Sequence, residues 1–224
     1  MMKAQFDEHL AGLNDELWED PEFAPTEEAL YEADEVKDEG ITFVRASQVE
    51  SLTGDDLAVF KDLIEPSDIN QGELGDCYLL SSLSCLAEHP DRIRKLFVSD
   101  QVNPSGCYGL IHCKDGQRQM TMVDDFIPCK TQIDQTYPCY SQAKGKELWV
   151  VLIEKMYAKL HSNYARIEGG QPYETIRDLT GAPGRIYLCE TTKDLWKIIL
   201  NADYKDYLMN AGINASENDN YYHD

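Results

Sequence analysis

The chain has few basic residues for its length. Among 224 residues there are 20 lysines and arginines against 41 aspartates and glutamates, so the formal net charge is −21 at pH 7. This surplus of negative charge repels the phosphates of nucleic acids and the headgroups of anionic membranes. The composition therefore argues against nucleic acid and anionic lipid as partners, and it predicts a soluble chain that attracts cations.

Long apolar runs and paired cysteines are also missing. No stretch approaches the roughly 18 consecutive apolar residues of a membrane-spanning helix, so we expect no membrane span. The first residues, MMKAQFDE, contain no apolar core of the kind that a secretion signal has. The cysteines number seven and include no C-x-x-C pair. Such a set is typical of a reducing compartment rather than of a disulfide framework or zinc site, and we expect a cytoplasmic protein.

The distribution of charge divides the chain near residue 40. Residues 1–40 are strongly acidic, with Lys3 and Lys37 as the basic exceptions. We interpret them as a partly ordered N-terminal extension whose scattered aromatic residues contact the core, and residues 1–12 as a solvated tail. Residues 41–224 have a globular composition and are long enough to bury a core as one domain.

The apolar pattern of the globular part alternates between helical and strand periods. Helices are predicted for residues 77–86, 93–97, 149–160 and, after a capping box at 191–194, 195–199. Strands are predicted for residues 41–44, 108–113, 119–123 and 185–189, the middle two forming a hairpin across an Asp-Gly turn. A polar loop is predicted for residues 129–145. The order is typical of an α+β domain in which helices predominate.

Residues 71–80, QGELGDCYLL, combine features that favour a reactive thiol. Glycines and an aspartate precede Cys77, and leucines at helical spacing follow it, which places the thiol in the first turn of a helix. Unpaired N–H groups and the positive end of the helix dipole favour the thiolate there. Gln71 and the Cys77 N–H could donate hydrogen bonds to the oxygen of an attacked carbonyl. The alternative is a buried cysteine that begins an ordinary core helix.

This segment resembles the active-site segment of the calpains, the calcium-dependent branch of the papain-like cysteine proteases. Other segments similar to calpain sequences follow in family order: residues 18–23, 123–128, 152–160, 178–181 and 195–200. The resemblance extends from about residue 13 to the last residue. It implies the helix-rich, Cys-bearing first lobe of the protease core, with Cys77 as nucleophile and Gln71 as oxyanion donor. The substrate it implies is an extended polypeptide across the cleft between two lobes.

The resemblance also implies a catalytic histidine and asparagine in a second lobe, for which this sequence has no matching motif. The five histidines, at positions 9, 89, 112, 161 and 223, lack the flanking residues of the family. The chain is then a fragment of a longer protease, a natural single-lobe binding or regulatory module, or a subunit whose base comes from another chain. A transglutaminase-like enzyme is a more distant alternative. We expect the chain alone to have essentially no peptidase turnover.

Calcium is the cofactor that the resemblance implies. Asp68 stands nine residues before Cys77, at the position of a calpain Ca²⁺ ligand. A later family glutamate is replaced here by Ala165, and Glu168 could substitute for it if the loop shifted. Because Ca²⁺ takes six to eight oxygen ligands, one carboxylate is insufficient. The alternative role of Asp68 is to cap a nearby turn.

Three further polar residues are interpreted as structural. Asp124 and Asp125 are adjacent, and on a strand such neighbours point to opposite faces, so they cannot act on one substrate atom. His112 lies within a predicted strand without a second ligand nearby, which favours a packing role.

Overall fold

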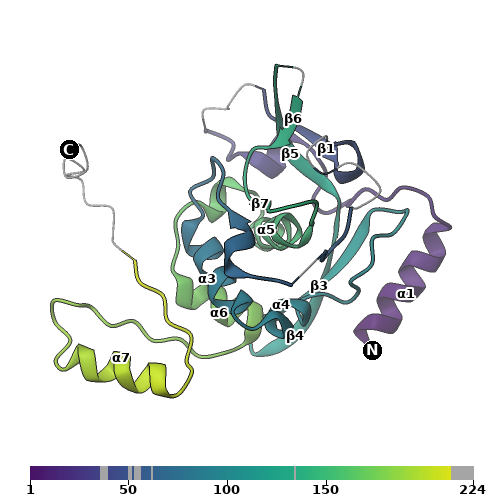
Figure 1. Cartoon of the computed structure of the whole chain (residues 1–224). Helices are drawn as coiled ribbons and strands as arrows, with labels where there is room; N and C mark the ends of the chain where they lie inside the picture. Colours follow the sequence, from purple (N-terminus) through teal and green to yellow (C-terminus); the bar gives the residue numbers. More distant parts are fainter. Residues whose placement is uncertain (36–39, 50–51, 53–56, 62, 134, 213–224) are drawn as a thin grey trace. The chain divides into compact units, whose positions relative to one another are not determined.

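The computed structural model describes residues 1–35, 40–49, 52, 57–61, 63–133 and 135–212 (Figure 1). The chain separates into two compact units, residues 1–186 and residues 187–224. The first unit combines helices with antiparallel strand pairs, which confirms the predicted α+β class. The division predicted near residue 40 stays a prediction.

The helix α5, Trp149–Leu160, forms the centre of the first unit (Figure 1). Every residue from 149 to 158 is buried, so the helix is enclosed on all sides rather than on one stripe. It contacts the hairpin strands β3 and β4, Cys107–Lys114 and Gln117–Asp124. The helices α3, Cys77–Ala87, and α6, Pro172–Thr180, pack against each other. The α6 helix was not predicted from the sequence.

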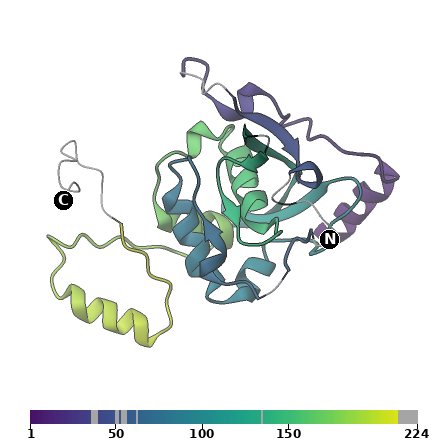
Figure 2. The ribbon, with the colours of Figure 1, turned by 45° about the horizontal axis from the view of Figure 1, so that its top comes forward.

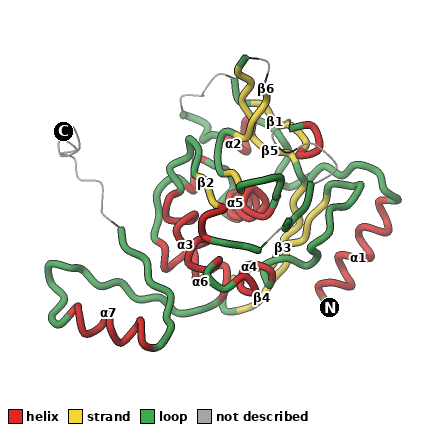
Figure 3. The backbone as a smooth tube through the Cα atoms, viewed as in Figure 1, coloured by secondary structure: helices red, strands yellow, loops and turns green. Residues whose placement is uncertain are grey.

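In the part of the chain that the structure describes, the strands form three separate antiparallel sheets, drawn in yellow in Figure 3. The predicted hairpin is confirmed as β3–β4, with Cys107 opposite Asp124 and Lys114 opposite Gln117. A three-stranded sheet has the order β1-β5-β6; its strands are Thr42–Arg45, Phe126–Gln132 and Gln135–Pro138. The two-residue strands β2 and β7, Ile69–Asn70 and Gln142–Ala143, pair with each other.

Two sequence predictions about strands are wrong. Most of the predicted loop at residues 129–145 lies in β5, β6 and β7, because β5 pairs with the distant strand β1 as well as with β6. Such pairing depends on tertiary context and is poorly visible in a polar segment. The strand predicted at residues 185–189 does not form. Its apolar side chains are exposed, Ile186 at 52% and Leu188 at 59%.

The N-terminal residues form a helix rather than the predicted solvated tail. The helix α1, Met2–Leu13, lies beside the β3–β4 hairpin in both ribbon views (Figures 1 and 2). Phe6 is 1% exposed, and its ring reaches within 3.0 Å of the place where a side chain on Gly109 would begin. One aromatic residue that docks on a glycine of β3 therefore anchors a helix whose composition suggested disorder. A short helix, α2 or Glu27–Leu30, buries Ala29 and Leu30.

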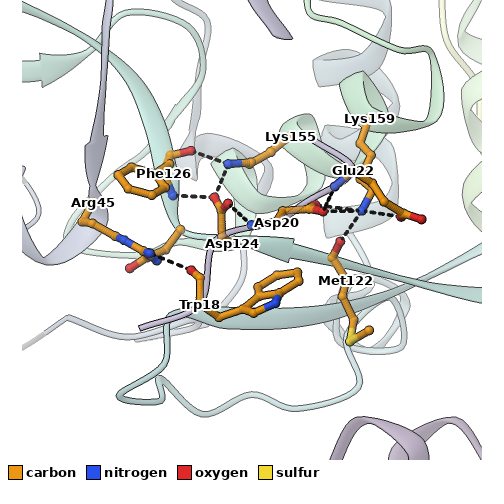
Figure 4. A network of polar contacts seen from close by, with 10 residues as sticks. Trp18, Asp20, Glu22, Arg45, Met122, Asp124, Phe126, Lys155 and Lys159 are labelled. Carbon is orange, nitrogen blue, oxygen red and sulfur yellow. Dashed lines mark hydrogen bonds and ion pairs between the residues drawn. The ribbon is translucent and has the colours of Figure 1, made fainter. Parts of the chain in front are cut away.

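The segment after α1 is held to the core by a buried polar network (Figure 4). The Asp124 carboxylate accepts hydrogen bonds from the backbone N–H groups of Asp20, at 2.7 Å, and Phe126, at 2.9 Å. Lys155 on α5 forms an ion pair with the same carboxylate. Lys159, one turn later, donates to both Asp20 oxygens at 2.9 and 2.7 Å. Asp124 is therefore structural, as predicted.

Asp125 helps to hold the same segment to the core at a second point, through Arg45. Its carboxylate accepts a hydrogen bond from Arg45 Nη1 at 2.6 Å, and Arg45 Nη2 donates to the Trp18 carbonyl at 2.6 Å (Figure 4). The guanidinium also lies 4.1 Å from the centre of the Phe126 ring. The two adjacent aspartates thus bind different partners, in agreement with the structural interpretation.

The remaining elements are short or lie in the second unit. Single turns occur at Ala46–Gln48, Pro66–Asp68 and Ala165–Ile167. The helix α4, Pro90–Arg94, begins and ends three residues before the predicted helix 93–97. In the second unit α7, Leu195–Tyr204, begins after Asp194 without a side-chain cap, so the predicted capping box at 191–194 is wrong. Within the described residues no helix has the length and hydropathy needed to cross a bilayer.

Candidate active site

The Cys77 side chain is exposed at the start of a buried helix. It is the first residue of α3, whereas Tyr78, Leu79 and Leu80 immediately after it are buried. The leucines therefore fix the helix in the core while the thiol faces outward. The thiols of Cys107, Cys129 and Cys139 are buried, and burial raises the pKa of each to about 12. Those three stay protonated at neutral pH.

Some of the first backbone N–H groups of α3 donate hydrogen bonds within the described chain, and that of Cys77 does not. Asp76 precedes the helix, and its carbonyl accepts hydrogen bonds from the N–H groups of Leu79, at 2.8 Å, and Leu80, at 3.2 Å. In the described part of the chain the Cys77 N–H has no acceptor. An open N–H next to an exposed thiol is the arrangement that an oxyanion donor requires.

The loop before Cys77 is held by backbone contacts. Gln71 Nε2 donates to the Leu74 carbonyl at 2.9 Å, which occupies one of its two N–H groups and turns the side chain back over the loop. A Cβ at Gly72 would overlap the Cys139 and Tyr140 carbonyl oxygens. This close approach explains why residue 72 is a glycine. The oxyanion role of Gln71 stays a prediction.

A second loop, at residues 169–170, also packs against the motif. Gly169 N–H donates to the Gly75 carbonyl at 2.9 Å, and a Cβ at Gly170 would overlap the Tyr78 ring. The ring of Tyr78 also meets the Tyr157 ring of α5 at a centroid distance of 6.4 Å. The structure thus places these two glycines against the nucleophile segment.

Two buried carboxyl groups, on the residue before Cys77 and on α5, were not found by sequence reasoning. Asp76 is 1% exposed and Glu154, in the middle of α5, is 2% exposed. Burial raises the pKa of Asp76 to about 6 and that of Glu154 well above its ordinary value. The available signal was an acidic residue inside the apolar run of residues 149–160.

Asp68 lies in the turn Pro66–Asp68, where its carboxylate caps the backbone. Its Oδ2 accepts a hydrogen bond from Glu65 N–H at 2.7 Å, and its carbonyl accepts one from Lys144 N–H at 2.7 Å. These contacts match the capping alternative. Glu168 lies near Gly75, beside the active-site segment. Over the described ranges no three His, Cys, Asp or Glu side chains gather as metal ligands.

Three histidines interact with residues away from the motif. His112 is buried, and its Nε2 lies 3.0 Å from Thr121 Oγ1, which agrees with the packing role; burial lowers its pKa. His161 Nδ1 lies 2.9 Å from the Tyr157 carbonyl oxygen, and His9 meets the Trp18 ring edge-on. His223 lies outside the described residues.

The sequence of this chain is similar to those of known proteins. A family model described as "Calpain family cysteine protease" matches residues 18–223. The chain is 30% identical over 219 residues to the calpain-type cysteine protease DEK1 of Arabidopsis thaliana, covering 92% of the chain and 10% of that protein. It is 33% identical over 155 residues to the calpain-1 catalytic subunit of Rattus norvegicus, covering 67% of the chain and 21% of that protein. The chain thus spans a small part of these relatives, and it belongs to the calpain family of cysteine proteases.

Proposed function

We propose that this chain is the nucleophile-bearing half of a calpain-type cysteine endopeptidase that cleaves polypeptides. The observation that carries the proposal is the exposed Cys77 thiol beside its own open N–H at the start of α3. The three buried thiols of the same unit lack this exposure. Family membership supports the reaction type.

In the proposed reaction the Cys77 thiolate attacks the peptide carbonyl carbon, and the new C–S bond leaves a negative charge on the oxygen. The Cys77 N–H and Gln71 Nε2 donate to that oxyanion, which requires Gln71 to exchange its Leu74 partner or to use its second N–H. The C–N bond then breaks as the leaving amine takes a proton, and water hydrolyses the thioester. We propose that a histidine and asparagine of a second lobe or another chain supply this proton transfer.

Peptide-cleavage assays test whether this chain supplies the nucleophile and a second lobe supplies the base. The chain alone is expected to show essentially no turnover of a fluorogenic peptide, because loss of the base typically removes several orders of magnitude of rate. The same chain joined to a calpain second lobe is expected to cleave the peptide, and Cys77→Ala in that protein to abolish cleavage. Cleavage that persists in Cys77→Ala contradicts the assignment. Peptide binding without any cleavage by the joined protein favours the non-catalytic binding module.

Calcium dependence is a separate proposal that rests on family membership. The site would centre on Asp68, whose carboxylate already caps the Pro66–Asp68 turn. The described residues supply no cluster of further side-chain ligands, so the fit is poor without backbone carbonyls and water. Isothermal titration with Ca²⁺ against Asp68→Ala tests it. A binding heat that Asp68→Ala removes supports the site, and an identical titration of both proteins contradicts it.

We further propose that the protein works in the cytoplasm. Cys77, Cys107, Cys113, Cys129, Cys139 and Cys189 are free thiols, which supports a reducing compartment. Fractionation of cells that express the protein tests the proposal, and recovery in a secreted or luminal fraction contradicts it.

A further inference from the structure

Asp76 and Glu154 differ from the three buried aspartates that pair with a cation. Asp20, Asp124 and Asp125 each form an ion pair with a buried or half-buried lysine or arginine. Among the described residues Asp76 and Glu154 have no such cation, although each is almost completely buried. An isolated carboxylate is strongly disfavoured in such surroundings.

The hydrogen bonds of the Asp76 and Glu154 carboxyl groups leave the oxygens of one facing the oxygens of the other. The Glu154 oxygens accept from the Ser141 N–H at 3.0 and 3.3 Å. Both Asp76 oxygens are buried, and in the described chain no N–H or O–H group of another residue donates to them. The group that faces them is the Glu154 carboxyl. Two carboxyl groups that face each other without a cation need a proton between them.

The direction of the Asp76 side chain matters for Cys77. An aspartate before a helix ordinarily accepts a hydrogen bond from one of the first backbone N–H groups. Asp76 makes no such cap, and its carboxyl group turns to α5 instead. The negative oxygen of a cap is thereby kept away from the open Cys77 N–H. The Asp76 carbonyl still fixes the first turn through Leu79 and Leu80.

We propose that Asp76 and Glu154 share a proton, and that this buried hydrogen bond positions the start of α3 so that the Cys77 N–H stays available to a substrate oxyanion. The proposal rests on the proposed function, since it assigns that N–H to the reaction. Asp76 and Glu154 are positioning residues and do not touch the substrate.

The raised pKa of Asp76 makes stability depend on pH. The titratable groups that face the pair are Glu168 and three tyrosines, Tyr78, Tyr140 and Tyr164, and none is cationic. A carboxyl whose pKa is higher in the folded state binds more protons when folded. Its stabilising contribution is complete below the ordinary pKa of about 4 and is lost as pH rises through about 6, the pKa of Asp76. For one such proton the folding equilibrium constant falls by up to about tenfold per pH unit in that window.

The first experiment tests the proton. Carboxyl ¹³C NMR of the whole chain is expected to show Asp76 titrating with a pKa near 6. Glu154→Ala removes the hydrogen bond that favours the ionised Asp76, so the pKa of Asp76 is expected to rise. An Asp76 that titrates at its ordinary pKa in the unmodified chain, or whose pKa does not change in Glu154→Ala, overturns the shared proton.

The second experiment tests positioning with two reagents. p-Nitrophenyl acetate acetylates a thiol through an oxyanion and releases p-nitrophenolate without needing an acid, whereas iodoacetamide forms no oxyanion. Asp76→Ala is expected to lower the acetylation rate of Cys77, relative to its alkylation rate, about tenfold or more. Asp76→Asn, which can donate to Glu154, is expected to restore most of the ratio. Asp194→Asn, an exposed aspartate before α7, is the matched control and is expected to change nothing.

The outcomes separate the two proposals. A Cys77 that reacts fast in the unmodified chain but keeps its rate ratio in Asp76→Ala overturns the positioning role and leaves the proposed function standing. If Asp76→Ala does not fold, Glu154→Ala decides, because it removes the same hydrogen bond and leaves Asp76 in place. A rate ratio that Glu154→Ala leaves unchanged then overturns the positioning role. A Cys77 that reacts no faster than the exposed Cys189 with either reagent overturns the proposed function and the positioning role together.

Discussion

At the scale of single residues, the conformation of the nucleophile segment depends on how closely its backbone can approach neighbouring backbone groups. Gly72 lies against the Cys139 and Tyr140 carbonyls, and Glu73 N–H donates to the Cys139 carbonyl at 2.9 Å. These contacts hold the loop that carries Gln71 against the segment after β6. The loop therefore reaches Cys77 in one conformation, which an oxyanion site requires.

Gly72→Ala is accordingly expected to lower the free energy of unfolding by about 1–3 kcal/mol, because the added methyl group overlaps two carbonyl oxygens. Urea unfolding measures this change. Gly12→Ala in α1 is the control: a Cβ there meets nothing within 4 Å, and alanine favours a helix. Equal effects of the two substitutions would show that the contact at residue 72 is unimportant.

At the scale of elements, α5 organises the first unit through both apolar and charged side chains. Lys155 is 2% exposed, donates to the Asp124 carboxylate and, at 2.7 Å, to the Phe126 carbonyl, and so joins α5 to the end of β4 and the start of β5. Burial lowers the Lys155 pKa, and the Asp124 charge opposes this. The helix thus positions the segments that lead from the hairpin to the three-stranded sheet.

Lys155→Met is expected to cost about 3–5 kcal/mol, since it leaves the Asp124 carboxylate buried without its cation. Lys3→Met removes an ion pair whose side chains are 68% and 54% exposed, and is expected to change stability by less than about 0.5 kcal/mol. Thermal or urea unfolding of both variants measures the difference. A loss below about 1 kcal/mol for Lys155→Met would rule out a structural role for this ion pair.

The docking of α1 is tested by its one buried aromatic residue. Phe6→Ala is expected to destabilise the first unit by about 3–5 kcal/mol and to expose residues 2–13 to protease, because Phe6 is 1% exposed. Leu17→Ala, at a side chain 69% exposed, serves as the neutral control. If Phe6→Ala leaves both stability and cleavage unchanged, the N-terminal residues behave as the solvated tail that composition suggested.

At the scale of the whole molecule, the sequence predicted what local patterns encode. The α3 and α5 helices and the β3–β4 hairpin were visible as periodic apolar residues, and the Cys77 motif was visible as a short segment of unusual composition. The β1-β5-β6 sheet, the docking of Phe6 and the Asp76–Glu154 pair were not. Each of these depends on residues far apart in sequence, whose pairing no local pattern reports.

The central claim is that Cys77 is a presented, reactive thiol, and competitive alkylation within one molecule tests it most directly. The chain is treated with a small amount of iodoacetamide at pH 6.5, and mass spectrometry compares Cys77 with Cys189, the other exposed cysteine. The account predicts that Cys77 is labelled at least about tenfold faster, because the positive end of the α3 dipole stabilises the negative charge on an attacking sulfur. Labelling of Cys77 at the rate of Cys189, or more slowly, would contradict the account.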